Sequence, residues 1–145
     1  MLVLFVLLGS LLLFRGLGAL GVDTFGSWAA ATRYALAVML VFTASAHFTR
    51  MKNDLERMMP NWVPWPRGMV YFTGGCELAG AIGLLIPSLR FVTGIALIAF
   101  FVLVLPANVK AARAALTLGG RAATPLWLRV PMQLLFIALT WWSIQ

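Results

Sequence analysis

A single carboxylate, Glu77, lies at the centre of the apolar stretch from Arg67 to Pro87. An ionised carboxylate within hydrocarbon is costly unless it is paired or neutralised, so a glutamate inside a membrane-spanning segment is a candidate functional residue. If this stretch forms a helix that enters the membrane at Arg67, Glu77 lies about 15 Å deep, close to the midplane. We therefore take Glu77 as a candidate catalytic group that relays protons.

Four further polar side chains are predicted to step inward from the same side of the membrane. His47 and Asn108 lie near that side on the second and fourth predicted helices, while Arg129 and Gln133 lie one turn apart on one face of the fifth. Together with Glu77 they predict a polar funnel that is closed at its deep end by the carboxylate. We take His47 as a second catalytic candidate and the other three as ligand-binding candidates.

Each of these residues also has a purely structural interpretation. Glu77 could form an ion pair with Arg15, which lies at a similar depth if the N-terminus is on the same side. His47 could simply cap helix carbonyls, and Arg129 could extend toward lipid phosphates. Tyr71 is either an interfacial anchor or an aromatic surface on which a flat ligand stacks.

The counts of metal-ligating residues limit the cofactors. With one cysteine, Cys76, and one histidine, the chain cannot by itself form a disulfide, a cysteine redox pair or a bis-histidine haem site. We expect no haem, zinc or iron–sulfur cluster bound by this chain alone. The net charge of +7 comes from residues between apolar segments, so it indicates membrane topology and not nucleic-acid binding.

The elements that must position these residues are membrane helices. The chain is 62% hydrophobic and only 10% charged, whereas about a quarter of the residues of a soluble domain are charged. We expect one transmembrane domain, residues 1–145, without a soluble domain. An all-α fold follows, with five apolar helices predicted over residues 2–22, 28–48, 67–87, 90–112 and 126–144.

Residues 49–66 connect the second and third helices and are predicted to form a short interfacial helix, because apolar and charged positions alternate at helical spacing. The first helix has no positive charge before its apolar run, so we expect a retained helix and not a cleaved signal peptide. The third and fourth helices are separated only by Ser88 and Leu89, which predicts a tight antiparallel hairpin.

Basic residues are distributed unequally between the two sides. One side has only Arg33 and Arg90, and the other collects eight: Arg50, Lys52, Arg57, Arg67, Lys110, Arg113, Arg121 and Arg129. The positive-inside rule then places the connections 49–66 and 111–125 in the cytoplasm, with the N-terminus inside and the C-terminus outside.

Several segments together resemble the DoxX family of small bacterial membrane proteins. They are His47-Phe48, Met59-Pro60 with Pro64, Tyr71, Thr73 to Leu78, Gly80 to Pro87, Leu105 to Asn108, and Trp127 to Gln133. The resemblance covers about residues 33–145 and leaves the additional N-terminal helix, with Arg15, outside.

This resemblance implies an antiparallel four-helix bundle in the bacterial cytoplasmic membrane and redox chemistry of quinones, thiols or sulfur compounds. Because the chain has one cysteine, a quinone-linked version is favoured over a thiol relay. Our leading hypothesis is a membrane subunit of a quinone-linked oxidoreductase, which binds a quinone-like or other small hydrophobic redox ligand.

In this hypothesis Arg129, Asn108 and His47 contact the carbonyl oxygens and Glu77 relays protons. Electrons would come from a soluble or membrane redox partner at the basic face, since the chain has no electron-carrier motif of its own. The protein could also form a homo-oligomer. The alternative is a non-catalytic module that binds lipid or small hydrophobic molecules or organises a membrane complex; a transporter is disfavoured because no inverted repeat is visible.

Overall fold

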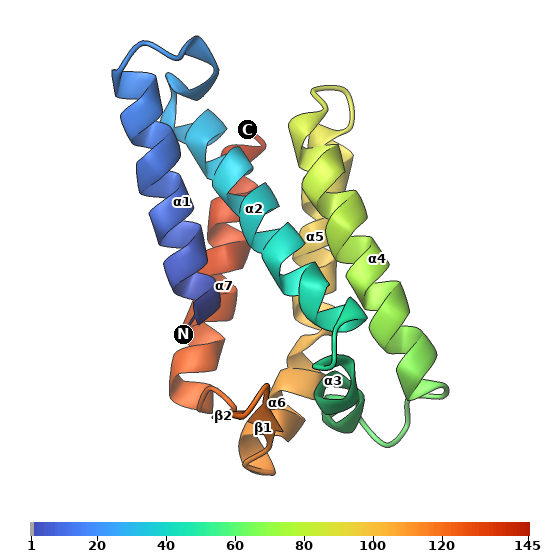
Figure 1. Cartoon of the computed structure of the whole chain (residues 1–145). Coiled ribbons are helices and arrows are strands. Elements are labelled where there is room, and N and C mark those ends of the chain that lie inside the picture. The colour runs from blue at the N-terminus through green and yellow to red at the C-terminus, as the bar shows by residue number, and fades with distance from the viewer. Residues whose placement is uncertain (1) are drawn as a thin grey trace.

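The computed structural model describes residues 2–145 and is all-helical apart from one short β-hairpin (Figure 1). Strands β1 and β2 pair antiparallel, with Leu118 opposite Arg121. In chain order the elements are α1 Leu2–Ala19, the 3-10 helix η1 Asp23–Phe25, α2 Trp28–Phe48, α3 Lys52–Met58, α4 Pro66–Leu85, α5 Arg90–Leu103, α6 Leu105–Arg113, β1 Thr117–Leu118, β2 Arg121–Ala122 and α7 Leu126–Ser143.

Four helices are long and apolar enough to cross a membrane. They are α1, α2, α4 and the nearly continuous segment Arg90–Arg113, which α5 and α6 share. These four candidate spans are compatible with the expected multi-pass membrane protein. The fifth predicted helix, α7, is present over 18 residues, but it is not among these four candidate spans.

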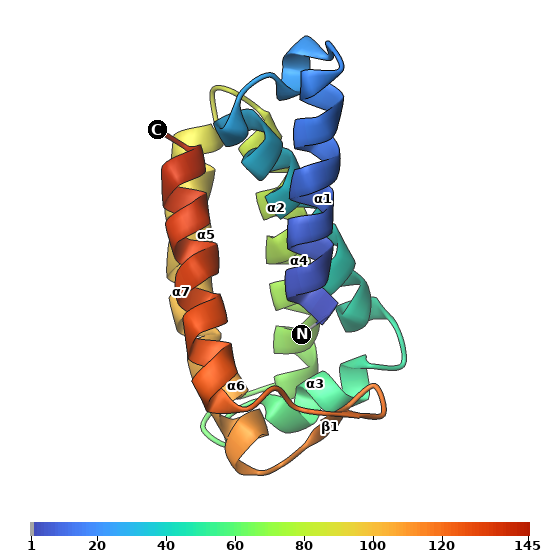
Figure 2. The ribbon, with the colours of Figure 1, turned by 90° about the vertical axis from the view of Figure 1, so that its left-hand side faces the viewer.

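Helices α2, α4, α5 and α7 each pack against the next, and α7 returns to α2. Helix α1 packs along the outside of α2. Figure 2 shows α1, α2 and α4 on one side and α5 and α7 on the other. The buried side chains of α2 are mostly alanine and leucine, which allow the neighbouring helices to approach closely.

Helices α2 and α4 approach each other closely at a glycine, Gly74. A Cβ atom on Gly74 would lie 2.6 Å from the Cβ of His47 and 3.2 Å from Cε2 of Phe48. Side-chain atoms do not approach each other this closely in proteins, so only glycine fits here without a shift of the helices. Gly74 thus determines how near the end of α2 lies to the middle of α4.

The predicted fourth helix is interrupted in its second half. Helix α5 ends at Leu103 and α6 begins at Leu105, one residue before Pro106. Proline has no backbone N–H and cannot continue the hydrogen-bond ladder, which accounts for the break. Two residues after Pro106, Asn108 is buried on the inner face of α6. Pro131, by contrast, lies inside the uninterrupted helix α7.

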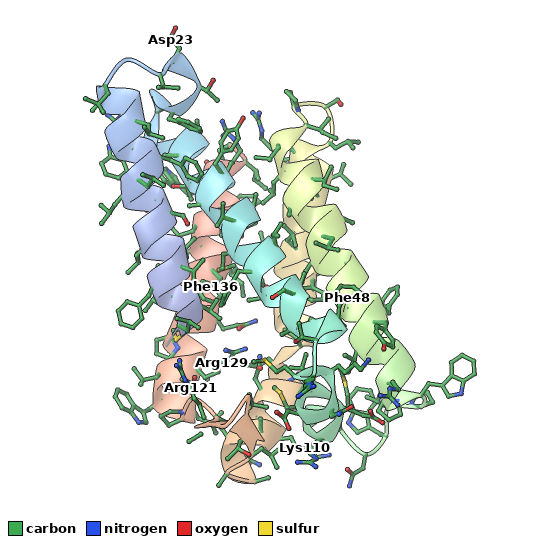
Figure 3. All side chains as sticks on the ribbon, in the orientation of Figure 1. Asp23, Phe48, Lys110, Arg121, Arg129 and Phe136 are labelled. Carbon is green, nitrogen blue, oxygen red and sulfur yellow. The ribbon has the colours of Figure 1, made fainter. Side chains whose placement is uncertain are left out.

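The basic end of the molecule is built from α3, α6, the β-hairpin and the ends of the long helices (Figure 1). Lys110 holds α6 to the loop after α3, since its Nζ lies 2.6 Å from the Met59 carbonyl oxygen and 2.9 Å from Asn61 Oδ1. The backbone N–H of Gly119 donates to Asp54 Oδ2 at 2.9 Å. Figure 3 shows Lys110 and Arg121 at this end and Asp23 at the opposite one.

Candidate functional site

His47 and Glu77 face each other across the α2–α4 contact. The distance between His47 Nε2 and Glu77 Oε2 is 3.6 Å, and each side chain is 12% exposed. His47 is near the last turn of α2, and Glu77 is in the middle of α4, one turn beyond Gly74. The small Cβ-free surface at Gly74 is what lets the imidazole ring reach the carboxylate.

The other ring nitrogen of His47 is fixed by the backbone of α4. His47 Nδ1 lies 2.6 Å from the carbonyl oxygen of Val70 and 3.3 Å from Thr73 Oγ1. A carbonyl oxygen can only accept a hydrogen bond, so Nδ1 carries a proton in this geometry. In the neutral ring, Nε2 is then the unprotonated nitrogen, and it is the one that faces Glu77.

Arg129 and Asn108 form a second polar pair between α7 and α6. Arg129 Nη2 donates to Asn108 Oδ1 at 2.7 Å. One turn further along α7, Gln133 Nε2 donates to the carbonyl oxygen of Phe101 at 2.6 Å, next to the break between α5 and α6. Figure 3 shows Arg129 on the inner side of α7, below Phe136.

A small cavity of about 60 Å³ connects the two pairs. Its polar lining consists of Glu77, Arg129, Gln133 and Thr43, and the rest is apolar. Within residues 2–145, three buried polar atoms of these two pairs have no hydrogen-bond partner: Glu77 Oε2, Asn108 Nδ2 and Arg129 Nε. Buried polar groups are normally hydrogen-bonded, so this space is suited to a small polar molecule such as water.

The guanidinium of Arg129 is permanently charged, and within residues 2–145 it has no carboxylate within 4.0 Å. Glu77 is the acidic residue that lines its cavity. The cavity therefore has a fixed positive charge and a carboxylate in its lining, and the His47 imidazole contacts that carboxylate from outside the lining. Residues 2–145 contain no cluster of three or more His, Cys, Asp or Glu side chains that could hold a metal ion.

The structure does not bring Arg15 to Glu77. The Arg15 guanidinium lies 5.2 Å from the ring centroid of Trp28, at the first residue of α2, whereas Glu77 faces His47 near the last. These two ends are about 28 Å apart along the helix axis. The predicted ion pair between Arg15 and Glu77 is therefore wrong. The prediction counted the depth of each residue from the start of its own helix, but the two starts are not level, because α1 begins higher in Figure 1 than α4 does.

Tyr71 also lies outside the site. Its side chain is exposed, and its hydroxyl oxygen accepts a hydrogen bond from Lys52 Nζ at 3.0 Å. Its ring lies 6.0 Å from that of Phe48. Tyr71 thus belongs to the surface between α2, α3 and α4 and not to the cavity.

A family model described as a domain of unknown function, DUF8561, matches residues 36–144. The chain belongs to this family. The match begins within α2 and ends one residue after α7. It includes both polar pairs and every residue that lines the cavity except Val3. It leaves out α1 and Arg15. No curated protein and no solved structure matches the chain.

The assignment to DUF8561 corrects the resemblance to DoxX, which is wrong. The segments that suggested it have local structural roles in this DUF8561 chain. Gly74 and Gly80 allow close contact with His47 and Leu97, and Pro106 marks the helix break. Small residues and prolines serve helix packing in many unrelated membrane proteins, so such segments do not by themselves identify a family.

Two threonines of the site were missed by sequence reasoning. Thr43 lines the cavity, and Thr73 contacts His47. A signal was available, because Thr43 precedes His47 by four residues and Thr73 precedes Glu77 by four, which places each pair on one helix face. The backbone carbonyl of Val70 contacts His47 and that of Phe101 contacts Gln133, and no sequence pattern indicates such backbone contacts.

Proposed function

We propose that this DUF8561 protein is a multi-pass membrane protein in which Glu77 and His47 bind and exchange a proton. The observation that carries the proposal is the 3.6 Å approach of His47 Nε2 to Glu77 Oε2, with the opposite ring nitrogen bound to a backbone carbonyl. An imidazole oriented in this way is ready to accept a proton on the side of the carboxyl group. Proton relays within membranes are built from such buried Glu and His side chains.

We further propose the arrangement in the membrane. Helices α2, α4, α5–α6 and α7 form an antiparallel four-helix transmembrane bundle, α1 adds an N-terminal span, and α3 lies at the interface. The excess of basic residues at the α3 end supports a cytoplasmic location for that end, with the N-terminus inside and the C-terminus outside. The proposed location is the bacterial cytoplasmic membrane.

Arg129 serves this proposal as the counter-charge. Through the cavity that it shares with Glu77, its positive charge stabilises the ionised carboxylate once the proton has left. Asn108 holds the guanidinium in place by the 2.7 Å hydrogen bond. A water molecule in the cavity can join the groups, because the space is polar and large enough.

The proton site fits the redox role that we infer for the protein. Reduction of a quinone-like ligand takes up protons together with electrons, and a membrane subunit that supplies the protons needs an acid–base pair of this kind. A redox partner supplies the electrons. The cavity of about 60 Å³ is far below the roughly 300–1,000 Å³ of typical ligand pockets, so such a ligand enters only if α1 or α7 moves away from it.

The test is infrared difference spectroscopy on protein reconstituted in lipid vesicles while the pH is changed. The proposal expects a carboxylic-acid C=O band of a buried group, which is lost in Glu77→Gln. The matched control is Glu56→Gln, whose partly exposed side chain lies beside Arg67, and it should leave that band unchanged. A band that persists in Glu77→Gln would contradict the proposal.

A second measurement separates the ligand class from the proton site. Addition of ubiquinone or menaquinone should quench the tryptophan fluorescence of the native protein and raise its melting temperature. If neither changes while the Glu77 band is present, the quinone-like ligand is wrong and the proton site stands.

A further inference from the structure

A second hollow lies on the outer side of α6 and is separate from the Glu77 cavity. It is an open groove of about 730 Å³ between α5–α6 and the loop that follows α3. Two of its lining residues are on that loop, and the others are on the outward face of α5–α6 or directly after it. They are Pro60 and Trp62, and Val102, Leu105, Pro106, Val109, Lys110, Arg113 and Ala114. None of them lines the Glu77 cavity.

The groove is apolar at one end and basic at the other. Val102, Leu105 and Val109 extend along one helix face toward Arg113, a distance of about 17 Å from first to last. Trp62, which is 76% exposed, forms the side wall on the loop. Among the described residues that line the groove, Lys110 and Arg113 are basic and none is acidic.

Within the described residues 2–145, no carboxylate lies within 4.0 Å of Lys110 or Arg113 at the basic end. Lys110 donates to two uncharged acceptors, the Met59 carbonyl and Asn61 Oδ1. The nearby acids are engaged elsewhere, since Asp54 contacts Gly119 N and Arg57, and Glu56 contacts Arg67. Two positive charges therefore remain at the mouth of an apolar groove.

We propose that this groove binds an anionic phospholipid, with the phosphate at Lys110 and Arg113 and an acyl chain along Val102, Leu105 and Val109. The position fits, because the apolar part belongs to a candidate membrane span and the basic part lies where that span ends. Basic pockets beside membrane helices recognise anionic lipid head groups in this way, and tryptophan favours the same interfacial level. The groove volume lies within the range of ordinary ligand pockets.

The experiment uses the full chain in nanodiscs of phosphatidylcholine, to which brominated phosphatidylglycerol or brominated phosphatidylcholine is added. Bromine quenches nearby tryptophan, so Trp62 reports occupation of the groove. We expect stronger quenching by the anionic lipid and loss of this difference in Trp62→Phe. Equal quenching by both lipids would overturn the proposal.

Two arginine variants distinguish a site from general attraction to a basic surface. Arg113→Gln should weaken the binding of phosphatidylglycerol about fivefold, as expected for one basic residue near a lipid surface. Arg121→Gln removes an equal charge from the exposed hairpin outside the groove, and it should change the binding of phosphatidylglycerol little. Equal effects of the two variants would show surface attraction alone and would also overturn the proposal. None of these outcomes depends on the Glu77 proton site.

Discussion

His47 Nε2 lies 3.6 Å from Glu77 Oε2, while Nδ1 of the same ring lies 2.6 Å from the Val70 carbonyl oxygen. The imidazole, near the end of α2, therefore contacts both the backbone and the buried carboxylate of α4. This relationship depends on helix packing as much as on the two side chains, because both contacts of His47 are made to α4.

The tautomer of His47 is directly predictable from this geometry. In the neutral ring, Nδ1 should carry the proton and Nε2 should be unprotonated. The chain has one histidine, so ¹⁵N NMR of histidine-labelled protein observes this ring without assignment. A neutral ring protonated at Nε2 would rule out the hydrogen bond to Val70 and the role that we give to it.

Gly74→Ala should destabilise the protein by about 1–3 kcal/mol, because the added methyl group overlaps His47 and forces α2 and α4 apart. The neighbouring Gly75→Ala is a matched control, since a Cβ atom there meets nothing within 4 Å. It should be neutral or stabilising by up to about 1 kcal/mol. Thermal unfolding in detergent compares the two. Similar melting temperatures for both variants would mean that the close approach at His47 is not required.

Arg129 and Asn108 should be energetically coupled. Their 2.7 Å hydrogen bond joins α7 to α6 and is partly buried, so a double-mutant cycle of Arg129→Gln and Asn108→Ala should give about 1–2 kcal/mol of interaction energy. Unfolding of the two single variants and the double variant in detergent measures it. Additive losses of stability would show that the two side chains act independently.

Arg15 should have no influence on the acid–base pair. It stacks on Trp28 at the far end of α2, so Arg15→Gln should leave the infrared band of Glu77 unchanged while Arg129→Gln alters it. The reverse result would restore the ion pair between Arg15 and Glu77 that depth counting suggested.

Much of the architecture could be predicted from the sequence, since hydrophobic length determines where membrane helices begin and end. The predicted helix 28–48 coincides with α2, and the predicted 67–87 lies within two residues of α4 at each end. Counting residues from the basic side also indicated that five polar side chains from four helices converge, and the structure brings these five together.

Rotation about a helix axis and the height of each helix could not be predicted. Tyr71 and Glu77 are on the same helix, yet one faces Lys52 at the surface and the other the cavity. Arg15 was misplaced because its helix starts at a different level. Contacts to the backbone, such as that of His47 with Val70, depend on tertiary packing and have no sequence pattern.

The most direct test of the account is a pH titration of the His47 ¹⁵N signals in the native protein and in Glu77→Gln, both in lipid vesicles. If the two groups exchange a proton, removal of the carboxylate moves the pH at which the His47 ring changes its protonation. Identical titration curves in the two proteins would show that His47 and Glu77 titrate independently and would contradict the proposed proton site.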